Sequence, residues 1–157
     1  MKKTYQGTKV SWAKTQTQIV KLLNERDIYE SRFTNLEDKF VLEFRVKESK
    51  KVFLGIGINK GITVRVVVPF HLGNNPSQRG REIELNRLHR VLLNHIKAKF
   101  VAIENGVTEF MEEFMPHLVI MDKTGNSTTM GQTLLPQYKK SIESGEQKPF
   151  NLLGDGN

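Results

Sequence analysis

Three segments in the first half of the chain alternate apolar and polar side chains with a period of two. They cover residues 39–47, 51–58 and 62–68, and three residues separate each from the next. A period of two is typical of a β-strand that buries one face and leaves the other in water. Connections this short join antiparallel neighbours. The pattern therefore predicts an antiparallel meander of three strands, or of four if residues 29–35 form the first.

Two amphipathic helices flank these strands in the sequence. Ser11 can cap a helix over residues 12–26, and residues 82–104 carry a longer uninterrupted helical pattern. The apolar residues of the longer pattern recur at helical spacing, at Leu85, Leu88, Leu92, Ile96, Phe100 and Ile103. The apolar strand faces must be covered, so we expect both helices to pack on them. The predicted fold class is α+β, an antiparallel three- to four-stranded meander covered by an N-terminal helix and a long central helix.

The rest of the chain is predicted as shorter elements and two irregular ends. The shorter elements are a loop at 71–81, a helix at 107–115, a strand at 117–121, a turn-rich stretch at 122–131 and a final helix at 134–144 that starts around Pro136. We interpret residues 1–10 as a basic arm, residues 11–144 as a single α+β domain and residues 145–157 as a flexible C-terminal tail.

Composition excludes several classes of protein. The chain has no cysteine, which excludes disulfide frameworks, thiolate zinc sites and cysteine nucleophiles. Its densest apolar stretch, residues 62–70, is far shorter than the roughly 20 apolar residues that span a bilayer. We therefore expect a cytoplasmic protein with no membrane partner. The formal net charge of +7 favours a polyanionic partner through Coulomb attraction and counterion release.

Cations gather on one side of the long helix. At about 100° per residue, Arg87, Arg90 and Lys97 fall within an arc of roughly 80°. Arg79 and Arg81 come just before this helix, beside the positive end of its dipole. Arginine forks match phosphate oxygens, so we predict that these residues bind nucleic acid. The alternative is an ordinary solvated helix face.

The predicted sheet adds further candidates for the same role. Arg45, Lys47 and Arg65 fall on the polar sides of their strands. Phe53 projects from a polar strand face near cations, and an exposed aromatic in that setting can stack on an unpaired base. The alternative for Phe53 is burial under the first helix or under a partner subunit.

The predicted order of one helix, three strands and a second helix resembles the topology of double-stranded-RNA-binding domains. The resemblance covers the middle of the chain and implies that a basic helix N-terminus faces phosphate. Arg79, Arg81 and Arg87 lie in the corresponding region. The chain is also similar in outline to phage-type strand-annealing proteins, which use a small antiparallel sheet with a helix. Both resemblances favour a nucleic-acid partner.

No catalytic constellation stands out. Asp38, Glu48 and Lys50 loosely match the acidic–acidic–Lys pattern of metal-dependent nucleases, but a full strand separates the two carboxylates. At about 3.3 Å per residue, they lie too far apart to share a metal ion. No histidine pair has the i, i+4 spacing of a helical zinc site, and His89 falls in the apolar arc of the long helix. We expect no cofactor, no metal and a core role for His89.

The sequence favours a small basic nucleic-acid-binding protein of low sequence specificity, which would suit bacterial or phage DNA metabolism. The alternative is a structural or interaction protein that works as a homo-oligomer. It rests on Val41, Phe53 and Val67, which are apolar on the polar side of the sheet and which we expect a helix or second subunit to cover. The acidic helix at 107–115, with Glu109, Glu112 and Glu113, is the other surface through which the chain could assemble. A metal-dependent nuclease-like enzyme is the weakest hypothesis. If the helix stripe binds nucleic acid, Arg87 and Arg90 should be exposed.

Overall fold

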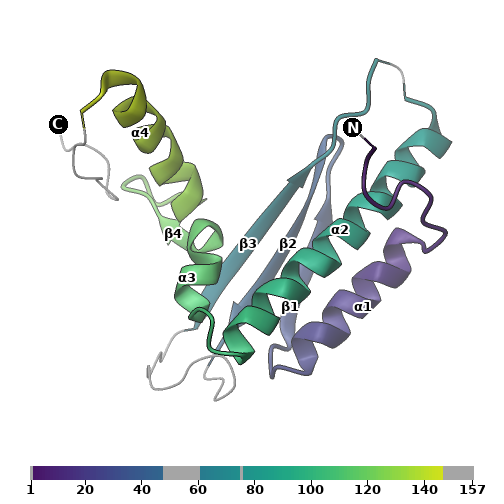
Figure 1. Ribbon diagram of the computed structural model, residues 1–157, viewed down its shortest axis with the longest axis horizontal. Helices are drawn as coiled ribbons and strands as arrows, with labels where there is room; N and C mark the ends of the chain where they lie inside the picture. The colour runs from purple at the N-terminus through teal and green to yellow at the C-terminus, as the bar shows by residue number, and fades with distance from the viewer. Residues whose placement is uncertain (1, 48–60, 75, 147–157) are drawn as a thin grey trace.

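Two helices cover one face of a three-stranded antiparallel sheet (Figure 1). This computed structural model describes residues 2–47, 61–74 and 76–146, and its α+β class is the predicted one. The elements, in chain order, are α1 (Trp12–Asn24), β1 (Glu30–Asn35), β2 (Lys39–Val46), β3 (Ile62–Pro69), α2 (Gln78–Glu104), α3 (Phe110–Phe114), the 3-10 helix η1 (Met115–His117), β4 (Val119–Met121), β5 (Ser127–Thr129) and α4 (Met130–Ser144). Strands β1, β2 and β3 form the sheet, while β4 and β5 pair separately.

The central strand of the sheet is β2, and both its neighbours run antiparallel to it. Leu42 lies opposite Phe33 on β1 and opposite Val66 on β3. Strand β2 therefore pairs directly with β3 instead of through an intervening strand. Residues 51–58, predicted as that strand, lie outside the described residues. The direct pairing places apolar positions of both strands on the same face, which favours this register.

The core lies between the helices and the face of the sheet beneath them, which we call the inner face. Six strand residues that point to this face are buried: Phe40, Leu42, Phe44, Val46, Val64 and Val66. Helix α2 contributes Leu92 and Ile96, which were predicted to be buried, and α1 contributes Ile19 and Leu23. The period of two in the strands and the helical period of the apolar residues therefore produce one shared core.

Helices α1 and α2 run side by side in the same direction (Figure 1). Near their starts, the backbone amide of Trp12 donates to Asn86 Oδ1 at 2.7 Å. Near their ends, Arg26 Nε pairs with Glu104 Oε1 at 2.6 Å. The side of α2 that faces α1 is thus occupied along its length, which limits what its cations can contact.

Helix α2 begins earlier than predicted, because a cap lies inside the predicted loop at 71–81. Ser77 Oγ accepts a hydrogen bond from the Gly80 amide at 3.0 Å, as an N-cap serine does. The prediction that the helix starts at residue 82 is therefore wrong. Arg79 and Arg81 lie in its first turn and not in a loop before it.

The predicted boundaries in the last third of the chain also need correction. Helix α3 covers only Phe110–Phe114 and not residues 107–115. Helix α4 starts at Met130, not near Pro136, because Thr129 and Gln132 form a capping box there. The sequence-based prediction also missed β5 within the turn-rich stretch.

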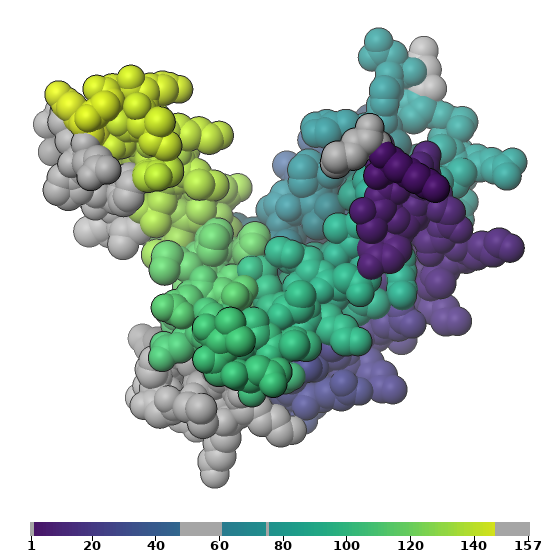
Figure 2. Space-filling view, in the orientation of Figure 1, coloured from purple at the N-terminus to yellow at the C-terminus, as the bar shows by residue number. Residues whose placement is uncertain are grey.

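Strands β4 and β5 and helix α4 form what we call the C-terminal arm, which projects from the β3 edge of the sheet (Figure 1). Leu118 bridges to Val64 on β3 at its base. A Cβ at Gly131 would lie 2.7 Å from the Pro116 carbonyl oxygen, so glycine allows α4 to pack closely on η1. Beyond this base the arm stands away from the body, and Figure 2 shows a notch between them.

Candidate functional site

The cationic stripe predicted on α2 is largely occupied by contacts within the protein. Arg87 donates to both Glu84 carboxylate oxygens, at 2.9 and 2.7 Å, and its side chain is only 13% exposed. It also reaches the Thr4 carbonyl oxygen at 3.4 Å. The hydrogen bonds from Arg87 hold the pKa of Glu84 below its ordinary value, although partial burial opposes this effect. The prediction that Arg87 is exposed is therefore wrong.

Two further arginines of the predicted set are also engaged. Arg90 is half-buried rather than exposed, and it donates to Gln18 Oε1 on α1 at 2.6 Å. Arg81 donates to the Leu36 carbonyl oxygen at 3.0 Å and lies 5.1 Å from the centre of the Phe70 ring. These arginines hold α2 to the elements around it, a role that their periodicity alone does not reveal.

Arg79 and Lys97 are the exposed members of the α2 set. They are 18 residues apart. At about 1.5 Å per residue, this spacing separates their backbones by about 27 Å. Engaged arginines lie between them, so these two cations do not form one continuous patch.

The other predicted cations lie on the face of the sheet that points away from α1 and α2, which we call the outer face. The register places Arg45 opposite Glu30 and Thr63, and Glu43 opposite Arg32 and Arg65. With the flanking residue Lys47 included, the cations of this face are Arg32, Lys39, Arg45, Lys47 and Arg65, and its carboxylates are Glu30 and Glu43. Cations are therefore in excess on an exposed strand surface.

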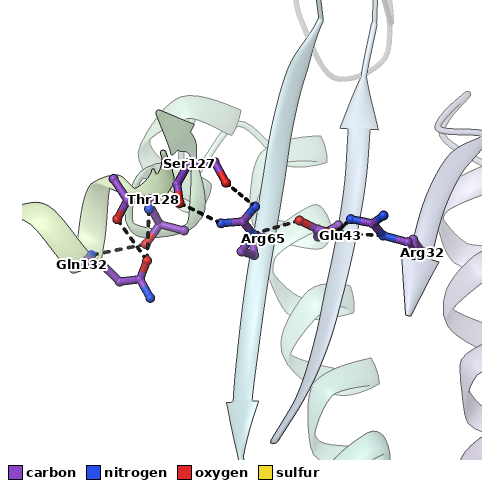
Figure 3. Close-up of polar contacts among 7 residues, drawn as sticks. Arg32, Glu43, Arg65, Ser127, Thr128 and Gln132 are labelled. Atoms are coloured by element: carbon purple, nitrogen blue, oxygen red, sulfur yellow. Dashed lines mark hydrogen bonds and ion pairs between the residues drawn. The ribbon is translucent and has the colours of Figure 1, made fainter. Parts of the chain in front are cut away.

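A chain of polar contacts crosses the outer face and ends on the arm (Figure 3). Arg32 pairs with Glu43, and Arg65 Nε donates to the other oxygen of Glu43 at 2.8 Å. Arg65 also donates to Ser127 Oγ at 2.9 Å. Partial burial raises the pKa of Glu43, but the hydrogen bonds from both arginines outweigh it and leave the pKa below its ordinary value. Arg65 thus has a structural role between sheet and arm.

The end of the outer face near Arg45 is more open. A shallow depression there is lined by residues that include Tyr29, Glu30, Arg32, Arg45 and Thr63. Tyr29 is 71% exposed. The Lys47 and Glu30 side chains form an ion pair and are 62% and 50% exposed. An ion pair this exposed contributes little to the stability of the fold, so Lys47 can exchange Glu30 for another anion.

Sequence analysis missed Tyr29, Arg32 and Lys39 as members of this surface. Arg32 could have been found, because it alternates with Phe33 in the predicted first strand. Tyr29 lies just outside that strand, and only the folded chain brings it beside Arg45 and Thr63. Phe53 lies outside the described residues.

The opposite end of the outer face is apolar. Thr34, Val41 and Val67 lie side by side on the three strands, and Val67 is 36% exposed. Leu36, in the turn after β1, is 43% exposed. The covering helix expected for this face is not found among the described elements, since α1 and α2 lie on the inner face (Figure 1). The outer face therefore has a charged half and an apolar half.

The described residues offer little that resembles a catalytic or metal centre. They contain no group of three or more His, Asp or Glu side chains placed to hold a metal ion. The acidic side chains of the helix predicted at 107–115 are engaged within the protein, since Glu109 and Glu112 form a capping box and Glu113 pairs with Lys99. His89 is fully buried, as predicted, and stacks on Phe40 with ring centres 3.9 Å apart.

Two findings complete the description of the site. Among the described residues, none of the helices combines the length and the apolar character needed to span a membrane. No protein-family model, curated protein or solved structure matches the chain.

Proposed function

We propose that this protein binds single-stranded nucleic acid, with low sequence specificity, through the charged half of the outer face. The observation that carries the proposal is the excess of cations on this half of the sheet surface, where Arg32, Arg45, Lys47 and Arg65 stand against two carboxylates, Glu30 and Glu43. A phosphate backbone laid across the strands would meet positive charge on each of them. Such contacts contribute affinity without reading bases, which accounts for the low specificity.

The ion pairs on this face leave it able to bind an anion. The Arg32 side chain is 72% exposed although it pairs with Glu43, and Lys47 is 62% exposed although it pairs with Glu30. Exposed pairs of this kind contribute little to stability, so a phosphate group can share or replace the carboxylate partner. Arg87 differs, because its pair with Glu84 is much less accessible.

The choice of single strands rests on Tyr29. Tyr29 is 71% exposed and lines the same depression as Arg32 and Arg45. A base in a duplex is stacked on its neighbours and shows only its edge, whereas an unpaired base can stack on an aromatic ring. A sheet surface with cations and one accessible ring suits a flexible, unpaired strand.

The test compares two double variants that remove the same charge from opposite sides of the molecule. Arg45→Ala with Lys47→Ala removes two cations from the outer face. Lys14→Ala with Lys97→Ala removes two exposed cations from the helices and serves as the control. Fluorescence anisotropy with a random single-stranded oligonucleotide, at about 50 to 200 mM salt, measures affinity and its salt dependence. We expect the first variant to bind several-fold more weakly, with a salt slope shallower by about two units.

Tyr29→Ala tests the stacking contribution separately. It should weaken binding to single strands more than binding to a duplex of the same sequence. If the parent protein fails to bind oligonucleotide at low salt, the proposal is wrong. Equal losses in the two double variants would show that net charge, and not this surface, drives binding.

A further inference from the structure

Two histidines meet where the C-terminal arm joins the body of the molecule. His95 lies on α2, and His117 is the last residue of η1, just before the arm begins. Their ring centres are 6.4 Å apart, and the rings are nearly perpendicular, at 86°. The next residue, Leu118, bridges to Val64 on β3. The two rings therefore span the junction between α2 and the base of the arm.

The same junction holds an ammonium group and a carboxylate. Lys99, one turn after His95 on α2, donates to Glu113 Oε2 at 3.1 Å and to the Glu113 carbonyl oxygen at 2.7 Å. The two side chains are 15% and 25% exposed, so water screens their charges less than it does at the surface. Because Glu113 already pairs with Lys99, it can offset little of the charge that protons would add to two further rings.

The other charged groups of the neighbouring elements are directed elsewhere. The Arg65 guanidinium on β3 is turned to the outer face, where it contacts Glu43, and Glu112 belongs to the capping box of α3. The charged residues of the β4–β5 hairpin lie in its turn, and those of α4 lie beyond the turn that packs on η1. Among the described residues, Lys99 and Glu113 are thus the charged groups that act on the two rings.

This arrangement favours neutral rings when the arm is closed. Burial lowers the pKa of both imidazoles, and the Lys99 ammonium lowers it further. Glu113 opposes the shift at His95, and a hydrogen bond with the Arg65 backbone opposes it at His117. A ring that moves into water regains a pKa of about 6.5. Separated rings therefore bind protons more readily than packed ones, so acid favours the state in which they are apart.

We propose that His95 and His117 form an acid-sensitive latch, which holds the arm against the body at neutral pH and releases it when both rings take up protons. The arm is the part that yields, because beyond its base it stands away from the body (Figure 2), whereas α2 is packed against α1 and the sheet. Release breaks the contact of Arg65 with Ser127 at the edge of the sheet. This proposal does not depend on nucleic-acid binding.

The absence of cysteine allows a dye to be placed on each side of the junction. Lys14 on α1 and Lys140 on α4 are exposed, and energy transfer between dyes on Lys14→Cys and Lys140→Cys reports the separation of arm and body. From about pH 7.5 to about pH 5, we expect the transfer efficiency of this full chain to change, with a midpoint below about pH 6.5. Circular dichroism should show unchanged helix content over the same range.

Two sets of histidine changes in the labelled chain assign the effect. His95→Gln with His117→Gln should remove the change in transfer efficiency. His71→Gln is the matched control, since His71 is exposed in the loop before α2, and it should leave the change intact. The latch is wrong if transfer in the parent does not depend on pH, if the double variant responds as the parent does, or if acid removes helix content instead.

A pair of opposite charges at His95 keeps the test decisive if the double variant does not fold. His95 is exposed, so the fold can accept either change. His95→Lys fixes a cation beside Lys99 and should move the midpoint of arm release to higher pH. His95→Glu places a carboxylate beside Lys99 and His117, favours a proton on His117 within the closed arm, and should keep the arm closed at about pH 5. Equal midpoints for the two variants overturn the proposal.

Discussion

The inner and outer faces of the sheet are built from the same strands, yet they differ in how many of their side chains remain accessible to solvent. On β3, Val66 points inward and is 4% exposed, while its neighbour Val67 points outward and is 36% exposed. The outer face also carries polar groups that are still open to solvent. The position of a side chain relative to α1 and α2 therefore decides whether it stabilises the fold or can meet a partner.

The same distinction separates the cations into two groups. Arg87 is 13% exposed on the helix layer, whereas Arg32 is 72% exposed on the outer face, although each pairs with a glutamate. A partly buried pair holds its arginine in one place, and an exposed pair does not. Arg81, Arg87 and Arg90 of α2 therefore serve packing, and the outer-face cations are better placed to bind.

The largest expected effect comes from making one substitution on each face. Val66→Ala removes two buried methyl groups and should cost roughly 2 kcal/mol in lost burial and cavity formation. Val67→Ala should cost about 0.5–1 kcal/mol, because water already reaches this side chain. Urea unfolding at low protein concentration measures both, so that association does not contribute. Equal costs would mean that the two faces are equally covered in solution.

A smaller difference should separate two arginines on α2. Arg87→Ala leaves the partly buried Glu84 carboxylate without its main donor and should cost about 1 kcal/mol, since Lys3 still contacts this carboxylate. Arg79 is exposed in the first turn, and Arg79→Ala should change stability by about 0.5 kcal/mol or less. Urea unfolding of both variants is again the measurement. A stable Arg87→Ala variant that loses oligonucleotide affinity would restore the helix stripe as the binding site.

Much of the fold could be predicted because it depends on local patterns. The alternation in β2 and β3 fixes the buried face, and the helical period of Leu92 and Ile96 fixes how α2 lies on it. The start of α4 was also readable, since Thr129 and Gln132 have the spacing of a capping box. The direct pairing of β2 with β3 could not be predicted from the sequence, because it depends on contacts between distant parts of the chain.

The candidate site was harder to predict, because exposure depends on tertiary packing. Arg87 was predicted to be available for a nucleic-acid partner, although Glu84 lies three residues earlier, a spacing at which helical side chains meet. Arg90 contacts Gln18, a residue on another helix that no local pattern connects to it. The outer face becomes a single surface only when the strand register brings Arg32, Glu43 and Arg65 into one row.

The smallest expected effect concerns His89, a polar residue buried on the covered side of the sheet. Its ring is fully buried, and its Nε2 lies 3.0 Å from the Gln16 side-chain nitrogen. Its Nδ1 lies 2.8 Å from the Leu85 carbonyl oxygen, so the neutral tautomer can donate to Leu85 and accept from Gln16. A second proton on His89 Nε2 would point at the Gln16 side-chain nitrogen, which is itself a donor, so the two groups could no longer form a hydrogen bond. Burial lowers the pKa of His89, although its hydrogen bond to Leu85 opposes the shift.

This lowered pKa gives the stability a predictable dependence on pH. An unfolded histidine, with a pKa of about 6.5, binds its proton more readily than His89 in the fold. Stability should therefore be complete above about pH 6.5 and should fall as the pH drops below it. His95 and His117 shift in the same direction, since burial lowers their pKa as well. Urea midpoints at pH 7.5 and 5.5 should differ less in a His89→Gln variant than in the parent. An unchanged difference would assign the pH dependence to His95 and His117, on the side of the molecule near the arm.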